Sequence, residues 1–176
     1  VNRNAYLKHF PIDKYVDFVV NRQHSAWDWT QAEQHGKWIE SAYLSAVQGD
    51  DKELLIKAES VLNRIIDSQE ANGYVGATAK SFRSPERPVR GMDAYELYFV
   101  FHAFITVYEE TGDKKALTAA EKLADYFLQY FGPGKLEFWP SDLRAPENNQ
   151  KHLDGHSDFA GHSVHYSWEG TLLCDP

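Results

Sequence analysis

Four histidines lie within fourteen residues near the end of the sequence, at positions 152, 156, 162 and 165. Imidazole is a common zinc ligand, but a zinc site needs its ligand atoms about 2 Å from one point. His162 and His165 would share one face of a helix, whereas His152 and His156 lie in a stretch with loop composition. Because this spacing matches no established zinc pattern, we expect no metal site within this chain.

Carboxylates offer a second chemistry, the hydrolysis of glycosides. That reaction usually takes two carboxyl groups, about 5 Å apart for retention or roughly 6.5 to 9.5 Å apart for inversion, one of them held protonated. Glu96 stands out because it follows a long connection and has Tyr95 and Tyr98 beside it. The alternative for Glu96 is a first-turn acid that stabilises the start of its helix, and Asp93 is expected to be the N-cap. The candidates are Asp93, Glu96, Asp154, Asp158 and Glu169.

Histidine and aromatic side chains are candidates for sugar contacts. His102 lies on the same predicted helix as Glu96 and is either hydrogen-bonded inside a bundle or in contact with a sugar. Tryptophans stack on sugar faces, but in a helical domain most of them are core, so we expect Trp38 to pack internally. For Trp139, in a long connection, both interpretations stay open. The segment "WDWTQAEQHGKW" supplies four further polar candidates for a pocket, Asp28, Gln31, His35 and Lys37.

The elements that would position these side chains form a repeat. "DKELLIKAESVLNRII" starts at residue 51 and "DKKALTAAEKLADYFL" at residue 113, a shift of 62 residues, and both place apolar residues on one helical face. Each copy follows a helix that is apolar almost all round, "GKWIESAYLSAV" or "ELYFVFHAFITVY". The joints "QGDD" and "ETGDK" are short glycine-containing turns with an aspartate placed to cap the next helix. The sequence therefore predicts two antiparallel hairpins, each with an inner and an outer helix.

The connections that follow the two outer helices are much longer, spanning residues 70–92 and 132–155. Loops above about 12 to 15 residues are uncommon in compact domains unless they are functional or disordered. Because both hairpin turns lie at one end of the helices, both long connections must lie at the other, with the starts of the inner helices. We therefore expect the functional groups at that end, where a third inner helix is predicted to start near Gly161.

Hairpins of this length are typical of an α/α toroid, so the predicted fold class is all-α. A closed toroid of six hairpins would need roughly twice this chain, and shorter repeats of about 34 residues fit the period poorly. We expect residues 1–176 to form a single domain that is an incomplete part of an (α/α)6 barrel. A missing C-terminal half or another chain would then cover the apolar surface at its open edge.

Three motifs on this repeat, in this order, resemble the N-terminal half of the bacterial β-L-arabinofuranosidases, glycoside hydrolases of family 127. The resemblance covers most of residues 25–176. The first motif is Gly-Tyr-(Leu/Val), the second is Glu-Leu-Tyr with a histidine one turn later, and the third is Gly-His-(Ala/Ser)-Val. The matching positions are Gly73, Tyr74 and Val75; Glu96, Leu97, Tyr98 and His102; and Gly161, His162, Ser163 and Val164.

The resemblance implies a carbohydrate substrate, with terminal β-L-arabinofuranosyl groups as the expected target. It also implies that His102 and His162 face the sugar pocket. The implied substrate-binding set is Tyr74, Glu96, Tyr98, His102, His162 and His165, the last being a departure from the arginine that many members carry. The resemblance also implies retaining hydrolysis in which a zinc-bound cysteine thiolate is the nucleophile. The residues that would match this nucleophile and its zinc ligands are expected beyond residue 176. Zinc is thus implied for the complete protein only, and Cys174 matches no catalytic position.

Composition excludes other classes of partner. A net charge of −8 with scattered lysines and arginines disfavours nucleic acid. No apolar run reaches the roughly 20 residues that a membrane helix needs, so we expect no membrane contact. A single cysteine leaves the compartment open. Two other functions remain: another α/α-toroid carbohydrate enzyme, of the unsaturated glucuronyl hydrolase or sugar epimerase type, and a non-catalytic helical-repeat scaffold that binds a protein.

Overall fold

The computed structural model describes residues 6–23, 33–89 and 93–136. The five α-helices in these ranges are α1 (Ile12–Val20), α2 (Glu33–Gly49), α3 (Lys52–Asp67), α4 (Asp93–Thr111) and α5 (Lys114–Tyr130). A single 3-10 turn, η2 (Lys80–Phe82), lies between α3 and α4, and the described residues contain no β-strand beyond isolated bridges. The all-α class and the helices of both predicted hairpins are therefore confirmed.

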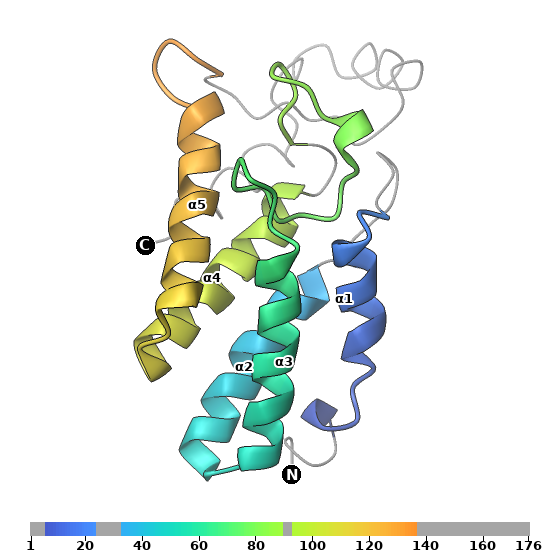
Figure 1. The fold of residues 1–176 in the computed structure, drawn as a ribbon, viewed down its shortest axis with the longest axis vertical. Coiled ribbons are helices and arrows are strands. Elements are labelled where there is room, and N and C mark those ends of the chain that lie inside the picture. Colours follow the sequence, from blue (N-terminus) through green and yellow to red (C-terminus); the bar gives the residue numbers. More distant parts are fainter. Residues whose placement is uncertain (1–5, 24–32, 90–92, 137–176) are drawn as a thin grey trace, which may run out of the picture.

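The helices form two layers that run in opposite directions (Figure 1). The inner helices α2 and α4 pack on each other more extensively than any other pair, and the outer helices α1, α3 and α5 lie along them. The inner helices approach closely at Gly36, where an added Cβ would lie 2.5 Å from the carbonyl carbon of Phe99. A side chain at this position would push the two helices apart, so glycine sets their spacing.

The outer helices bury one face each, as their apolar spacing predicts. On α3 the buried residues are Leu54, Ala58, Val61, Leu62 and Ile65, and on α5 they are Ala116, Ala119, Ala120, Leu123 and Tyr126. One residue departs from the predicted stripe: Leu128 is 66% exposed. Tyr126 is buried instead, because its side chain meets the connection between α3 and α4, which covers this part of α5.

The two ends of the helices differ in how the chain connects. At the turn end, residues 50–51 join α2 to α3 and residues 112–113 join α4 to α5. At the loop end, residues 68–89 lie beside the end of α1 and the start of α4 (Figure 1). The long connection is thus placed with the start of an inner helix, as predicted. The predicted third inner helix near Gly161 and most of the connection at 132–155 fall outside the described residues.

None of the helices in the described ranges is both long and apolar enough to cross a membrane.

Candidate functional site

The first turn of α4 carries two buried carboxylates at the loop end. Asp93 is 0% exposed and Glu96 is 1% exposed. Asp93 lies in the first turn of α4, where the sequence predicts the N-cap, and the three residues before it lie outside the described ranges. One oxygen of Asp93, Oδ1, accepts hydrogen bonds from the hydroxyls of Tyr74 and Thr78, each at 2.9 Å. This carboxylate therefore ties the start of α4 to the preceding connection.

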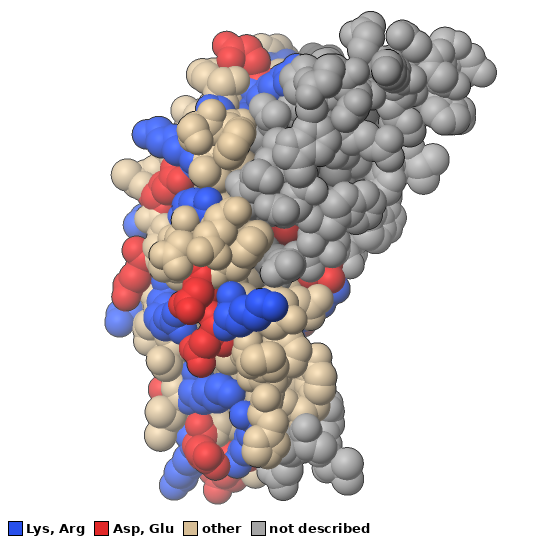
Figure 2. Space-filling view, turned by 90° about the vertical axis from the view of Figure 1, so that its right-hand side faces the viewer, with Lys and Arg blue, Asp and Glu red and all other residues tan. Residues whose placement is uncertain are grey.

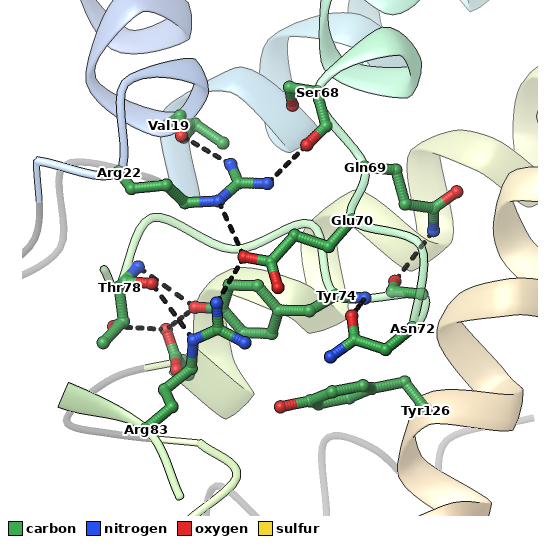
Figure 3. Close-up of polar contacts among 12 residues, drawn as sticks. Val19, Arg22, Ser68, Gln69, Glu70, Asn72, Tyr74, Thr78, Arg83 and Tyr126 are labelled. Atoms are coloured by element: carbon green, nitrogen blue, oxygen red, sulfur yellow. Dashed lines mark hydrogen bonds and ion pairs between the residues drawn. The ribbon is translucent and has the colours of Figure 1, made fainter. Parts of the chain in front are cut away.

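Tyr74 occupies the centre of this arrangement (Figure 3). Its side chain has no exposed surface, and its hydroxyl also accepts a hydrogen bond from the backbone N–H of Thr78 at 3.0 Å. The guanidinium of Arg83 lies 3.6 Å from the centre of the Tyr74 ring, and the ring of Tyr126 lies 5.4 Å away. Burial, and then the negative charge of Asp93, raise the pKa of Tyr74 well above its ordinary value. The hydroxyl therefore stays protonated and remains a donor.

A chain of charged groups continues from Arg83 toward α1 (Figure 3). Arg83 Nη2 pairs with Oε1 of Glu70, and Nε of Arg22 lies 3.5 Å from that same oxygen. Arg22 also donates to the carbonyls of Val19, at 2.7 Å, and Ser68. These side chains are mostly buried, with 5% of Arg83, 15% of Arg22 and 23% of Glu70 exposed. The ends of α1 and α3 and the connection before α4 are thereby joined by paired charges.

Tyr98 and His102 form a second group, further along α4. They are one turn apart, their ring centroids are 4.4 Å apart, and both side chains are half-buried. A half-buried imidazole and phenol offer hydrogen-bond donors and acceptors together with apolar ring faces. The described structure therefore brings Glu96, Tyr98 and His102 onto the first three turns of one inner helix.

The start of α2 contributes polar groups that sequence reasoning partly missed. Glu33 and His35 are buried, and Glu33 Oε1 accepts from Gln34 Nε2 at 3.0 Å and pairs with Lys37 Nζ at 3.1 Å. Lys37 Nζ also lies 4.3 Å from the centre of the Phe99 ring on α4. His35 and Lys37 had been singled out as pocket candidates, whereas Glu33 had not. Its four-residue spacing from Lys37 is the signal that would have found it.

Other predicted residues divide into those confirmed and those not described. Trp38 is 3% exposed and donates from Nε1 to the carbonyl of Leu7 at 3.1 Å, so its predicted core position is confirmed. His162 and His165 lie outside the described residues, as do the loop histidines and Trp139. Within the described ranges, no group of three or more His, Cys, Asp or Glu side chains is arranged to hold a metal ion.

Comparison with known proteins identifies relatives over most of the described structure. The family model described as "Beta-L-arabinofuranosidase, GH127 catalytic domain" matches residues 3–139. A non-reducing end β-L-arabinofuranosidase from Bifidobacterium longum subsp. longum is 29% identical over 104 residues, which cover 55% of this chain and 16% of that protein. The chain therefore spans less than a fifth of the length of this relative.

Two solved structures share the fold. The GH127 β-arabinofuranosidase BT3674 is similar with a TM-score of 0.58 and 22% identity, over 97% of this chain and 29% of that one. The GH127 β-L-arabinofuranosidase Ara127N-Se from Geobacillus stearothermophilus T6 has a TM-score of 0.58 and 17% identity, over 99% of this chain and 31% of that one. The predicted toroid architecture is therefore supported, with this chain matching under a third of each structure.

Proposed function

Because this chain belongs to the family of GH127 β-L-arabinofuranosidase catalytic domains, we propose that it forms part of a glycoside hydrolase acting on terminal β-L-arabinofuranosyl groups. The family match over residues 3–139 carries this proposal. The described site is compatible with it, since α4 places a buried carboxylate, a phenol and an imidazole on neighbouring turns. A furanose presents several hydroxyl groups, and carboxylate, phenol and imidazole side chains can each form hydrogen bonds with a hydroxyl.

We assign sugar contacts to Glu96, Tyr98 and His102, together with His162 and His165 from outside the described residues. Tyr74 belonged to the same predicted set, but its hydroxyl already donates to Asp93 and accepts from the N–H of Thr78, so little of its hydrogen-bonding capacity is left for a sugar. Instead of facing a ligand, Tyr74 donates its hydrogen bond to Asp93 in the first turn of α4. The described residues show no side-chain group suited to zinc, so this proposal takes no step through a metal. We assign no nucleophile and no zinc ligand among the described residues.

Sugar binding to the 176-residue chain tests this assignment. Isothermal calorimetry with methyl β-L-arabinofuranoside should show affinity that falls roughly tenfold in Glu96→Gln and in His102→Asn, since each loses a hydrogen bond to the ligand. Glu110→Gln, at the exposed far end of α4, and His9→Asn, an exposed histidine, are the matched controls and should bind like wild type.

Two results would contradict the proposal in different ways. Equal affinity in wild type, Glu96→Gln and His102→Asn would remove α4 from the sugar site. Turnover of an unsaturated glucuronide by this chain, without affinity for the arabinofuranoside, would instead favour another α/α-toroid carbohydrate enzyme.

A further inference from the structure

We propose that Tyr74 is a positioning residue, which fixes the first turn of α4 through Asp93 and is itself fixed by Arg83. Only the expected ligand, an arabinofuranoside bound by α4, rests on the proposed function. Its structural part rests on contacts between described residues. It assigns to the Gly-Tyr segment a task that differs from sugar contact.

The hydroxyl of Tyr74 has almost no capacity left for a ligand. A phenol has one O–H donor, and this one is used on Asp93 at 2.9 Å. Its oxygen also accepts from the Thr78 N–H at 3.0 Å. Because the side chain is 0% exposed, a sugar cannot approach the remaining lone pair without moving the wall of the site.

The ring of Tyr74 is held from several directions. Arg83 lies over the ring, with its guanidinium carbon 3.6 Å from the ring centre, so a largely desolvated cation–π contact holds this face of the ring. Nε of Arg83 donates to the Thr78 carbonyl at 3.2 Å, so the same side chain holds both residues that bond Asp93. An added Cβ at Gly76 would lie 2.4 Å from the Tyr74 hydroxyl oxygen, which shows how closely the backbone wraps the phenol.

The backbone that carries Tyr74 is fixed as well. The N–H of Tyr74 donates to Asn72 Oδ1 at 3.1 Å, and its carbonyl accepts from the N–H of Glu70 at 2.8 Å. Glu70 in turn pairs with Arg83 and Arg22, which connects the turn to the ends of α1 and α3. The segment that carries the phenol is therefore tied to the ends of α1 and α3 (Figure 3).

The first turn of α4 is where such support has most effect. The first four N–H groups of a helix have no partner within the helix, so its first turn opens more readily than its middle. Asp93 is the first residue of α4, and Glu96 lies three residues later on the same side. A tether on Asp93 therefore limits movement of the Glu96 carboxylate.

Hydrogen exchange tests the structural part without any ligand. In Tyr74→Phe, exchange of the amides of residues 94–98 should accelerate roughly tenfold, because one hydrogen bond to a charged group is lost. Tyr43→Phe is the matched control: it also removes a buried hydroxyl, but one on α2 whose charged neighbours are Glu59 and Asp113, not Asp93 or Arg83. Exchange at 94–98 should stay at the wild-type rate there.

A second variant guards against a general loss of fold. Thr78→Val removes the other hydroxyl bond to Asp93 while it keeps the size of the side chain, so it should accelerate the same amides and leave those of α3 unchanged. Wild-type exchange at residues 94–98 in both Tyr74→Phe and Thr78→Val would overturn the positioning role.

A double-mutant cycle on sugar binding distinguishes positioning from direct contact. If Tyr74 acts through the first turn of α4, Tyr74→Phe should weaken binding of methyl β-L-arabinofuranoside in wild type but have little effect in Glu96→Gln. Independent, additive losses would indicate a direct sugar contact and overturn the proposal. Absence of arabinofuranoside binding in wild type would count against the proposed function alone, and the exchange rates would still decide the role of Tyr74.

Discussion

The two ends of the helices are held by polar contacts of opposite kinds. At the turn end, Asp51 caps α3 through the N–H of Leu54 at 3.2 Å, and Asp113 caps α5 through the N–H of Lys115 at 2.8 Å. Both caps lie within three residues of sequence, and the Asp113 cap is exposed. Asp51 also forms one longer-range ion pair, with Lys8 Nζ at 3.1 Å. At the loop end, by contrast, buried side chains bond across the chain, as Tyr74 and Asp93 do over 19 residues.

The contacts at the two ends therefore affect different properties: the start of a helix in the sequence, and the position of a helix relative to its neighbours. Local caps decide where α3 and α5 begin, and each contributes about 1 kcal/mol. The buried contacts at the loop end decide where α4 begins relative to α1 and α3, which no local preference determines. Residues proposed to bind sugar lie on that helix, so the candidate site depends on the long-range contacts.

The largest expected loss of stability comes from substituting a glycine with positive φ at the loop end, compared with one at the turn end. Gly73, at the loop end, has φ +98°, and an added Cβ would lie 2.0 Å from the carbonyl oxygen of Lys122 on α5. Gly112, at the turn end, has φ +73° and open space around it. Gly73→Ala should lower the free energy of unfolding by about 3 kcal/mol or more, through strain and a backbone clash.

Gly112→Ala provides the matched control for that experiment. It carries only the conformational penalty of the left-handed region, about 1 to 2 kcal/mol. Urea unfolding followed by circular dichroism measures both variants. Equal losses in the two would show that the loop end is no more tightly packed than the turn end.

Two arginines give the next comparison. Arg83 pairs with Glu70 and is 5% exposed, whereas Arg64 pairs with Asp13 and Asp17 on the surface and is 36% exposed. Arg83→Met leaves Glu70 with one partner fewer in a mostly buried place and should cost about 3 kcal/mol in the free energy of unfolding. Arg64→Met should cost less than about 1 kcal/mol.

The salt dependence of the two arginine variants sharpens the same point. The small loss in Arg64→Met should shrink further when unfolding is measured at 1 M salt, because exposed pairs are screened. The loss in Arg83→Met should persist. A loss in Arg83→Met that disappears with salt would contradict the buried character of the loop-end pair.

The caps at the turn end should have a smaller effect. Asp51→Ala and Asp113→Ala should each lower the free energy of unfolding by about 1 kcal/mol, since each leaves one N–H of the first turn without its acceptor. Asp51→Ala also removes an ion pair with Lys8, which keeps Glu53 as a partner. Because the two caps lie in different hairpins, the double variant should show the sum of the two losses. A loss well above that sum would mean that the turn end is also held cooperatively.

The same division explains which features could be predicted from the sequence. The two hairpins, their turns and the one-sided burial of α3 follow from spacing and capping residues that lie close in sequence. The exposure of Leu128 was not predicted, because the connection that covers Tyr126 instead comes from a segment about 40 residues earlier.

The candidate site was harder to predict for the same physical reason. The resemblance placed Tyr74 among the sugar contacts, but its burial results from Arg83, Tyr126 and Asp93 together. None of these neighbours shares a local pattern with it. Glu96, Tyr98 and His102 were predicted from the motif that carries the resemblance, and periodicity brings only Tyr98 and His102 together, one turn apart on one face of α4.

A last expected effect appears only in alkali and concerns buried hydroxyls toward both ends. Burial raises the pKa of Tyr126 to about 12, and burial also raises that of Tyr43 on α2. Below about pH 10 both states of the chain keep these protons, so stability should not change. Above it the unfolded chain ionises while the folded chain does not, so the free energy of unfolding should fall as pH rises. Urea unfolding at pH 9 and pH 11 should show a smaller fall in both Tyr126→Phe and Tyr43→Phe than in wild type. We expect the two ends to behave alike in this respect. A smaller fall in Tyr126→Phe alone would contradict that expectation and would mean that the ends also differ in proton binding.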